Sequence, residues 1–197
     1  MDPVRTVTGR AVPLDRADVD TDQIISSDWL KRIERTGFGA GLFSEWRRDE
    51  DFVLNNPAYD GARILVAGPN FGIGSSREHA VWALVDYGFQ AVVSPRIADI
   101  FRNNSTRSGL VPVVVSREVG RKLLEQVVLD PGLEITIDVD RRLLQAPAID
   151  LEEPFELDED ARQRLLGGLD DIGITLAHGE AIDRFESMRP DYLPSVS

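Results

Sequence analysis

The segment from Gly68 to His79 constrains the fold more than any other part of the chain. Its sequence is Gly-Pro-Asn-Phe-Gly-Ile-Gly-Ser-Ser-Arg-Glu-His, with three glycines between a strand pattern and a helix pattern. The apolar run 63–67 predicts a buried strand, and a helix is predicted from Ser76 to about Gly88. The glycines let the backbone turn sharply and approach a ligand closely. The two hydroxyls and the guanidinium that follow predict a site for a small anion, because unpaired N–H groups gather at a helix start.

The order of the other elements predicts an α/β fold. Short apolar runs alternate with helix-length segments, which favours a mainly parallel sheet flanked by helices. The predicted strands are 63–67, 90–94 and 110–115, and the predicted helices are 76–88, 96–107 and 117–127. Outside this region we expect one or two strands in 4–14, a short helix or turn at 29–34, irregular to helical structure in 42–60, a hairpin in 133–149 and helices at 158–167 and 178–188. We expect one domain over residues 1–197, with a helical tail from about residue 155.

The charge of the chain limits its partners. The net charge is −12, from 34 acidic and 22 basic residues. A field of this sign repels phosphate backbones, so no nucleic-acid partner is expected. No apolar run approaches the length of a membrane span, and the N-terminus has no apolar signal segment. We expect a cytoplasmic protein with no membrane partner.

The sequence contains no cysteine and only two histidines, His79 and His178. Without thiols the chain can form no disulfide, offer no thiolate nucleophile and hold no iron–sulfur cluster by itself. No histidine spacing resembles a zinc site. We therefore expect no metal and no cofactor to be bound by this chain.

The glycine segment has three further interpretations. Ser75 and Glu78 fit a capping box, in which the Ser75 hydroxyl only satisfies an N–H group of the helix. A dinucleotide loop is disfavoured because Arg77 replaces the third glycine and Ser94-Pro-Arg96 ends the next strand where an acid is needed. A serine hydrolase is also disfavoured, since the loop is not Gly-x-Ser-x-Gly.

Several motifs together resemble one family. Asn70-Phe-Gly-Ile-Gly-Ser-Ser-Arg-Glu-His-Ala80 resembles the signature of the swivelling domain of aconitase-type hydro-lyases, in the form found in 3-isopropylmalate dehydratase small subunits. Three other stretches agree, and the likeness spans nearly the whole chain. The first is Asp20-Thr-Asp-Gln-Ile-Ile25, and the second is Ala98-Asp-Ile-Phe-Arg-Asn-Asn104 with Gly109-Leu-Val-Pro112. The third resembles the bacterial small-subunit form and consists of Arg35-Thr-Gly-Phe-Gly39 with Leu42-Phe-x-x-Trp46 and the tail Leu169-Asp-Asp-Ile-Gly-Ile-Thr-Leu176.

The resemblance implies a fold, a reaction and a partner. The family fold is a swivelling β/β/α domain. The family reaction moves a hydroxyl between adjacent carbons of a diacid, here 2-isopropylmalate and 3-isopropylmalate in leucine biosynthesis, by removing water and adding it back. A [4Fe–4S] cluster serves as the Lewis acid. Because this chain lacks the thiolates for such a cluster, the resemblance implies that the cluster lies in a separate large subunit.

The resemblance also assigns roles to residues. Ser75 matches the catalytic base, which removes a proton from carbon. The expected substrate-binding residues are Ser76, Arg77, Asp22, Thr21, Lys31 and Arg32. A guanidinium such as that of Arg77 can hold a carboxylate through two hydrogen bonds. Asp22 also fits a simple turn, and the two basic residues near position 31 equally fit a solvated surface. His79 is expected to pack or cap in the helix without a catalytic role.

Alternatives remain for the substrate and for the glycines at 36–41. A homoaconitase, dimethylmalate or methylcitrate type of dehydratase would keep Ser75 and Arg77 and change residues 30–38. A non-catalytic anion-binding module of the same fold would need no serine base. Residues 36–41 (Thr-Gly-Phe-Gly-Ala-Gly) are expected to form a loop without regular structure, either a mobile lid or a plain connector.

Overall fold

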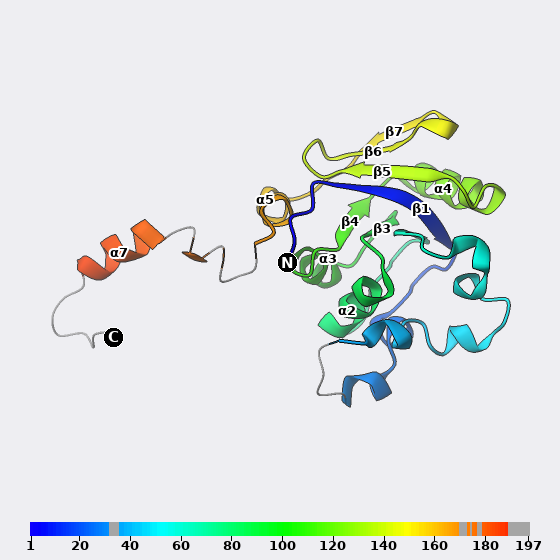
Figure 1. Cartoon of the computed structure of the whole chain (residues 1–197), viewed down its shortest axis with the longest axis horizontal. Coiled ribbons are helices and arrows are strands. Elements are labelled where there is room, and N and C mark those ends of the chain that lie inside the picture. Colours follow the sequence, from blue (N-terminus) through cyan, green and yellow to red (C-terminus); the bar gives the residue numbers. More distant parts are fainter. Residues whose placement is uncertain (32–35, 170–172, 174, 177–178, 189–197) are drawn as a thin grey trace.

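A mixed β-sheet forms the centre of the fold (Figure 1). The structure is a computed structural model and describes residues 1–31, 36–169, 173, 175–176 and 179–188. Within these residues the sheet has seven strands in the order β4-β3-β2-β1-β5-β6-β7. The strands are β1 (Thr6–Leu14), β2 (Ile64–Ala67), β3 (Ala91–Ser94), β4 (Val111–Val114), β5 (Glu134–Asp138), β6 (Leu143–Ala146) and β7 (Leu151–Pro154).

The sheet combines a parallel and an antiparallel half. Strands β1 to β4 pair in parallel, with Val12 opposite Leu65 between β1 and β2. On its other side β1 pairs antiparallel with β5, and β6 and β7 extend that half. The predicted α/β fold is confirmed. The antiparallel half is larger than the predicted hairpin, because it also contains β7. This strand was not predicted, since its sequence Leu-Glu-Glu-Pro is short and has no strand pattern.

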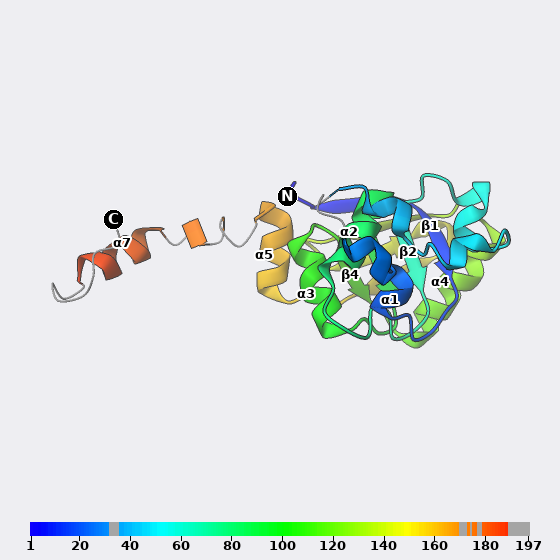
Figure 2. The same ribbon diagram turned by 90° about the horizontal axis from the view of Figure 1, so that it is seen from below.

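Helices cover the parallel half on both faces. The helices of the described residues are α1 (Thr21–Ile24), α2 (Glu78–Tyr87), α3 (Asp99–Arg107), α4 (Arg117–Leu129), α5 (Glu159–Gly167) and α7 (Gly179–Ser187). Every residue of β2 and β3 is buried. Since successive side chains of a strand point to opposite faces, this burial requires cover on both. Helices α2 and α3 lie side by side, α5 lies against α3, and α4 contacts β1 and β2 (Figures 1 and 2).

The predicted elements from 63 to 129 are confirmed, with later helix starts. The second predicted helix begins at Asp99 rather than Arg96, and the first at Glu78 rather than Ser76. The predicted helices near 158–167 and 178–188 correspond to α5 and α7. The predicted irregular stretch 42–60 contains short 3-10 helices: η3 (Trp46–Arg48), η4 (Val53–Asn55) and η5 (Pro57–Tyr59). A further 3-10 helix, η6, spans Pro147–Ile149. Another, η1 (Ser27–Lys31), covers the first part of the helix or turn predicted at 29–34, and the rest of that prediction lies outside the described residues.

The prediction that residues 36–41 hold no regular structure was wrong. Phe38–Gly41 form the 3-10 helix η2, which packs against α2. A Cβ at Gly39 would lie 2.8 Å from the backbone nitrogen of Tyr87, and a Cβ at Gly41 would lie 2.4 Å from the Trp29 ring. These two glycines therefore permit close packing. The mobile lid stays a prediction.

We predict that Gly72→Ala destabilises the protein more than Gly61→Ala. Both glycines have positive φ, +74° and +72°, so both substitutions strain the backbone. A Cβ at Gly72 would also lie 2.4 Å from the Phe101 ring, whereas nothing lies within 4 Å of one at Gly61. We expect Gly72→Ala to lower the free energy of unfolding by about 2 kcal/mol more than its control, as measured by urea denaturation. Equal losses would show that Phe101 does not confine this loop.

Candidate functional site

Two loops meet at the carboxyl edge of the parallel strands. One follows β1 and ends at α1, and the other, residues 68–77, follows β2 and is called here the glycine loop. Ligand sites of open α/β sheets lie at this edge. The backbone N–H of Gly72 donates to the Val19 carbonyl at 2.8 Å, and the N–H of Thr21 donates to the Ile73 carbonyl at 2.9 Å. Asp20 and Ile73 form a parallel β-bridge. The two loops are therefore joined along their backbones.

The loop after β1 is closed by a capping box that was not predicted from the sequence. The Asp20 carboxylate accepts from the Gln23 backbone N–H at 2.8 Å, and the Gln23 side chain accepts from the Asp20 N–H at 3.0 Å. This arrangement satisfies two N–H groups at the start of α1. Thr21 and Ile24 are the buried residues of this helix, whereas Asp22 is exposed. The spacing of Asp20 and Gln23 was the signal that could have found this cap.

The glycine loop is bent by residues in left-handed conformations. Gly72 and Gly74 have φ of +74° and +95°, and Asn70 has φ of +63°. The Asn70 side chain donates to the Asp18 carboxylate at 2.6 Å, and Asp18 itself has φ of +55°. The buried Ser94 hydroxyl donates to the Gly68 carbonyl at 2.7 Å. Hydrogen bonds thus hold the start of the loop, at Gly68 and Asn70, while Ser75 and Ser76 near its end are exposed.

The capping interpretation of Ser75 was wrong. Helix α2 begins at Glu78, its N-cap is Arg77, and no side chain caps it. Arg77 is extended, with φ of −126° and ψ of 104°, so Glu78 is the first helical residue rather than the third. The Ser75 hydroxyl is exposed and accepts a hydrogen bond from Arg77 Nε at 3.1 Å. It therefore remains available to a ligand.

Arg77 links the two loops through its side chain. Its Nη1 forms an ion pair with the Asp22 carboxylate, from a residue 55 positions earlier. The Arg77 side chain is 21% exposed and that of Asp22 is 59% exposed. Within the described part of the chain, Arg77 Nη2 has no partner. The guanidinium is thus held on two sides and has one donor nitrogen left for an anion.

Backbone donors lie beside these side chains. Among the described residues, the N–H groups of Ser75, Ser76 and Arg77 donate to no protein acceptor. They lie at the amino end of α2, where the helix dipole favours negative charge. Three consecutive free donors together with a guanidinium make this end of the glycine loop suitable for a carboxylate or for an anionic oxygen.

The structure brings together most of the predicted site residues. Ser75, Arg77 and Asp22 are in contact, and Ser76 is exposed beside them. Thr21 lies beneath them, because it is buried and its hydroxyl donates to the Ser75 carbonyl at 3.0 Å. Lys31 ends η1, while its side chain and the whole of Arg32 lie outside the described residues.

His79 packs against two aromatic rings, as expected. Its ring centroid lies 4.7 Å from that of Trp82 and 5.3 Å from that of Phe38. Among the residues described, no group of three or more His, Cys, Asp or Glu side chains could hold a metal ion. The sequence also contains no cysteine.

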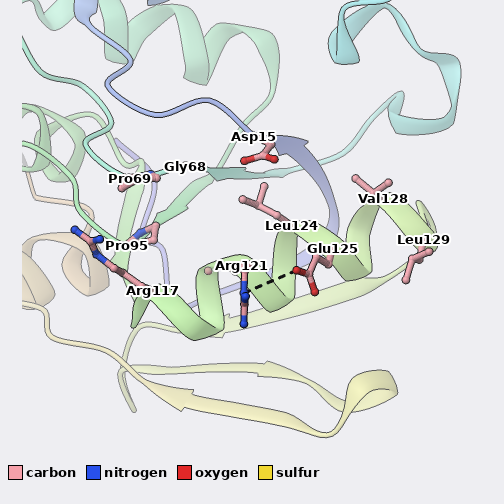
Figure 3. Close-up of a pocket in the computed structure, with 11 residues that line it drawn as sticks. Asp15, Gly68, Pro69, Pro95, Arg117, Arg121, Leu124, Glu125, Val128 and Leu129 are labelled. Carbon is pink, nitrogen blue, oxygen red and sulfur yellow. Dashed lines mark ion pairs between the residues drawn. The ribbon is translucent and has the colours of Figure 1, made fainter.

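A cavity of about 740 Å³ lies away from Ser75, along α4 (Figure 3). Its wall on the helix includes Arg117, Leu124 and Val128, and Pro69 and Pro95 face them from the loops after β2 and β3. Ser75, Arg77 and Asp22 do not line it. The predicted catalytic serine is exposed and lies outside this cavity.

Comparison with protein-family models identifies the kind of domain that this chain contains. Residues 1–118 match the family model described as the aconitase C-terminal domain. Residues 171–192 match a second model, which describes the C-terminal domain of the 3-isopropylmalate dehydratase small subunit. The 3-isopropylmalate dehydratase of Methanocaldococcus jannaschii has the same fold, with a TM-score of 0.68 and 24% identity over 91% of this chain and 99% of that chain.

Two close relatives show to which family within this class the chain belongs. The 3-isopropylmalate dehydratase small subunit of Frankia alni is 63% identical over 189 residues, 96% of each chain. The protein of the same description from Rubrobacter xylanophilus is 57% identical over 196 residues, 100% of each chain. The chain belongs to the family of 3-isopropylmalate dehydratase small subunits.

Proposed function

We propose that this chain is the small subunit of a hydro-lyase that interconverts 2-isopropylmalate and 3-isopropylmalate by dehydration and rehydration. The names and high identity of the relatives support the reaction. The observation that carries the mechanism is the contact of Ser75 with Arg77 at the amino end of α2. In the described part of the chain, no helix is long and apolar enough to cross a membrane.

Ser75 acts as the base in this proposal. Its Oγ, as the alkoxide, takes the proton from the carbon next to the one that bears the hydroxyl and becomes a neutral serine. The hydroxyl takes up a proton from solvent and leaves as water, and the electron pair of the broken C–H bond forms the double bond of an unsaturated diacid. Returning the proton and the hydroxyl to the opposite carbons gives the isomer. A free serine is too weak an acid for this step, so its anion needs stabilisation. In this proposal the stabilisation comes from Arg77 Nε, 3.1 Å from Oγ, and from the free N–H groups of the loop.

Arg77 and Ser76 bind a substrate carboxylate in this proposal. The free Nη2 of Arg77 and the exposed Ser76 hydroxyl supply neighbouring donors. Asp22 holds the guanidinium from the opposite loop and so fixes its direction. Charge-assisted bonds of this kind are about twice as strong as neutral ones. That Lys31 and Arg32 contact the side group of the substrate stays a prediction.

The residues of this chain do not fit an iron–sulfur cluster. Such clusters are held by thiolates, and the chain has no cysteine. We propose that the cluster is held by the large subunit, whose surface closes over the exposed Ser75 and Ser76. The base and the carboxylate-binding groups then come from this chain.

We predict that Ser75→Ala, assembled with the large subunit, lowers kcat by about 10³-fold or more, the usual range for a lost general base. The fold should be kept, because Ser75 caps no helix. Turnover of 2-isopropylmalate measures the effect, and thermal unfolding checks the fold. Ser108→Ala, at the C-cap of α3, is the control and should retain normal turnover. A near-normal rate for Ser75→Ala would favour a non-catalytic anion-binding role.

We predict that Arg77→Lys raises KM for the diacid about tenfold, because an ammonium cannot reproduce the planar fork of a guanidinium. Steady-state kinetics of the assembled complex measure KM. Arg48→Lys is the matched control, since Arg48 is also paired with a carboxylate, that of Glu45 at 2.6 Å. An unchanged KM for Arg77→Lys would argue against the carboxylate contact.

A further inference from the structure

Thr21 occupies an unexpected place beneath the catalytic serine. Its side chain is buried, with 3% of the residue exposed. Its hydroxyl donates to the Ser75 carbonyl at 3.0 Å, and its backbone N–H donates to the Ile73 carbonyl at 2.9 Å. A Cβ added at Gly74 would lie 3.5 Å from the Thr21 hydroxyl oxygen, so the hydroxyl lies close to the glycine backbone. Thr21 thus touches the glycine loop on both sides of its last glycine.

These contacts fix a peptide plane next to the reacting atom. The carbonyl of Ser75 and the N–H of Ser76 belong to one planar trans peptide, so they point in opposite directions. Holding the carbonyl toward the buried Thr21 directs the Ser76 N–H to the opposite, open side of the loop. The same constraint limits the rotation of Ser75, which follows a glycine with φ of +95°. Glycine by itself leaves this part of the backbone free to turn.

Thr21 is itself held firmly. It is the first residue of α1, directly after Asp20, whose capping box with Gln23 closes the start of the helix. The β-bridge between Asp20 and Ile73 lies one residue before the Thr21 contacts. The hydroxyl is therefore presented from an ordered element to a loop that would otherwise have several conformations.

We propose that Thr21 is a positioning residue for Ser75 and does not contact the substrate. Its hydroxyl sets the Ser75–Ser76 peptide plane, and through it the direction of an N–H group that stabilises the serine anion. This inference rests on the proposed function of Ser75. It replaces the expectation from the sequence that Thr21 binds substrate, which would require an accessible hydroxyl.

Thr21→Val tests the proposal, because valine keeps the side-chain size and removes the donor. In the complex with the large subunit we expect kcat for 2-isopropylmalate to fall about tenfold, equal to about 1.4 kcal/mol of activation free energy, while KM changes less than threefold. Thr21→Ser keeps the donor and should restore at least half of the wild-type kcat. Thr106→Val is the matched control: Thr106 is also buried, at 6% exposed, and its hydroxyl donates to the Asn103 carbonyl at 3.1 Å. It should retain normal kcat.

The outcomes separate the possible roles. A normal kcat for Thr21→Val, or a rise in KM alone, would overturn the positioning role. If Thr21→Ser lowered kcat as much as Thr21→Val, the claim that the hydroxyl is responsible would be overturned. The same would hold if Thr106→Val lowered kcat as much as Thr21→Val. Ser75→Ala is run in parallel. Normal turnover by that variant would refute the proposed function and the Thr21 role with it, whereas an inactive Ser75→Ala with a normal Thr21→Val would refute the Thr21 role alone.

Discussion

The site depends on the backbone pairing of two loops at the carboxyl edge of the sheet. The hydrogen bonds between Val19 and Gly72 and between Thr21 and Ile73 join segments that are far apart in the sequence. They bring Asp22 to Arg77 across 55 positions. Parallel pairing of β1 with β2 sets this geometry, because parallel strands end at the same edge. Without it the guanidinium would have no fixed direction.

The strands and helices of the parallel half could be predicted because each is a local pattern. Fully apolar runs such as 64–67 predict strands that are covered on both faces. The start of α2 could not be read in the same way. Ser75 and Glu78 have the spacing of a capping box, but the positive φ of Gly74 turns the chain so that Arg77 becomes the N-cap. The backbone conformation of the glycine loop therefore overrode the capping signal.

The same reason explains the other differences. The sequence Asp20-Thr-Asp22 gives no sign that its middle residue is buried, because burial is decided by the glycine loop from elsewhere in the chain. The glycines of η2 suggest a flexible loop, yet they allow close contact with α2 and Trp29. The contact of Ser75 with Arg77 could be anticipated only through the resemblance to the family, since spacing alone favoured a cap.

The central claim is that two chains share the chemistry. This chain offers an exposed serine and a half-buried arginine, and it has no thiolate to hold an iron–sulfur cluster. The most direct measurement is turnover of 2-isopropylmalate by the purified chain alone and after mixing with its large subunit. The account predicts no turnover by the chain alone and activity that saturates at a fixed ratio of the two proteins. Turnover by the isolated chain, free of any second protein, would contradict it.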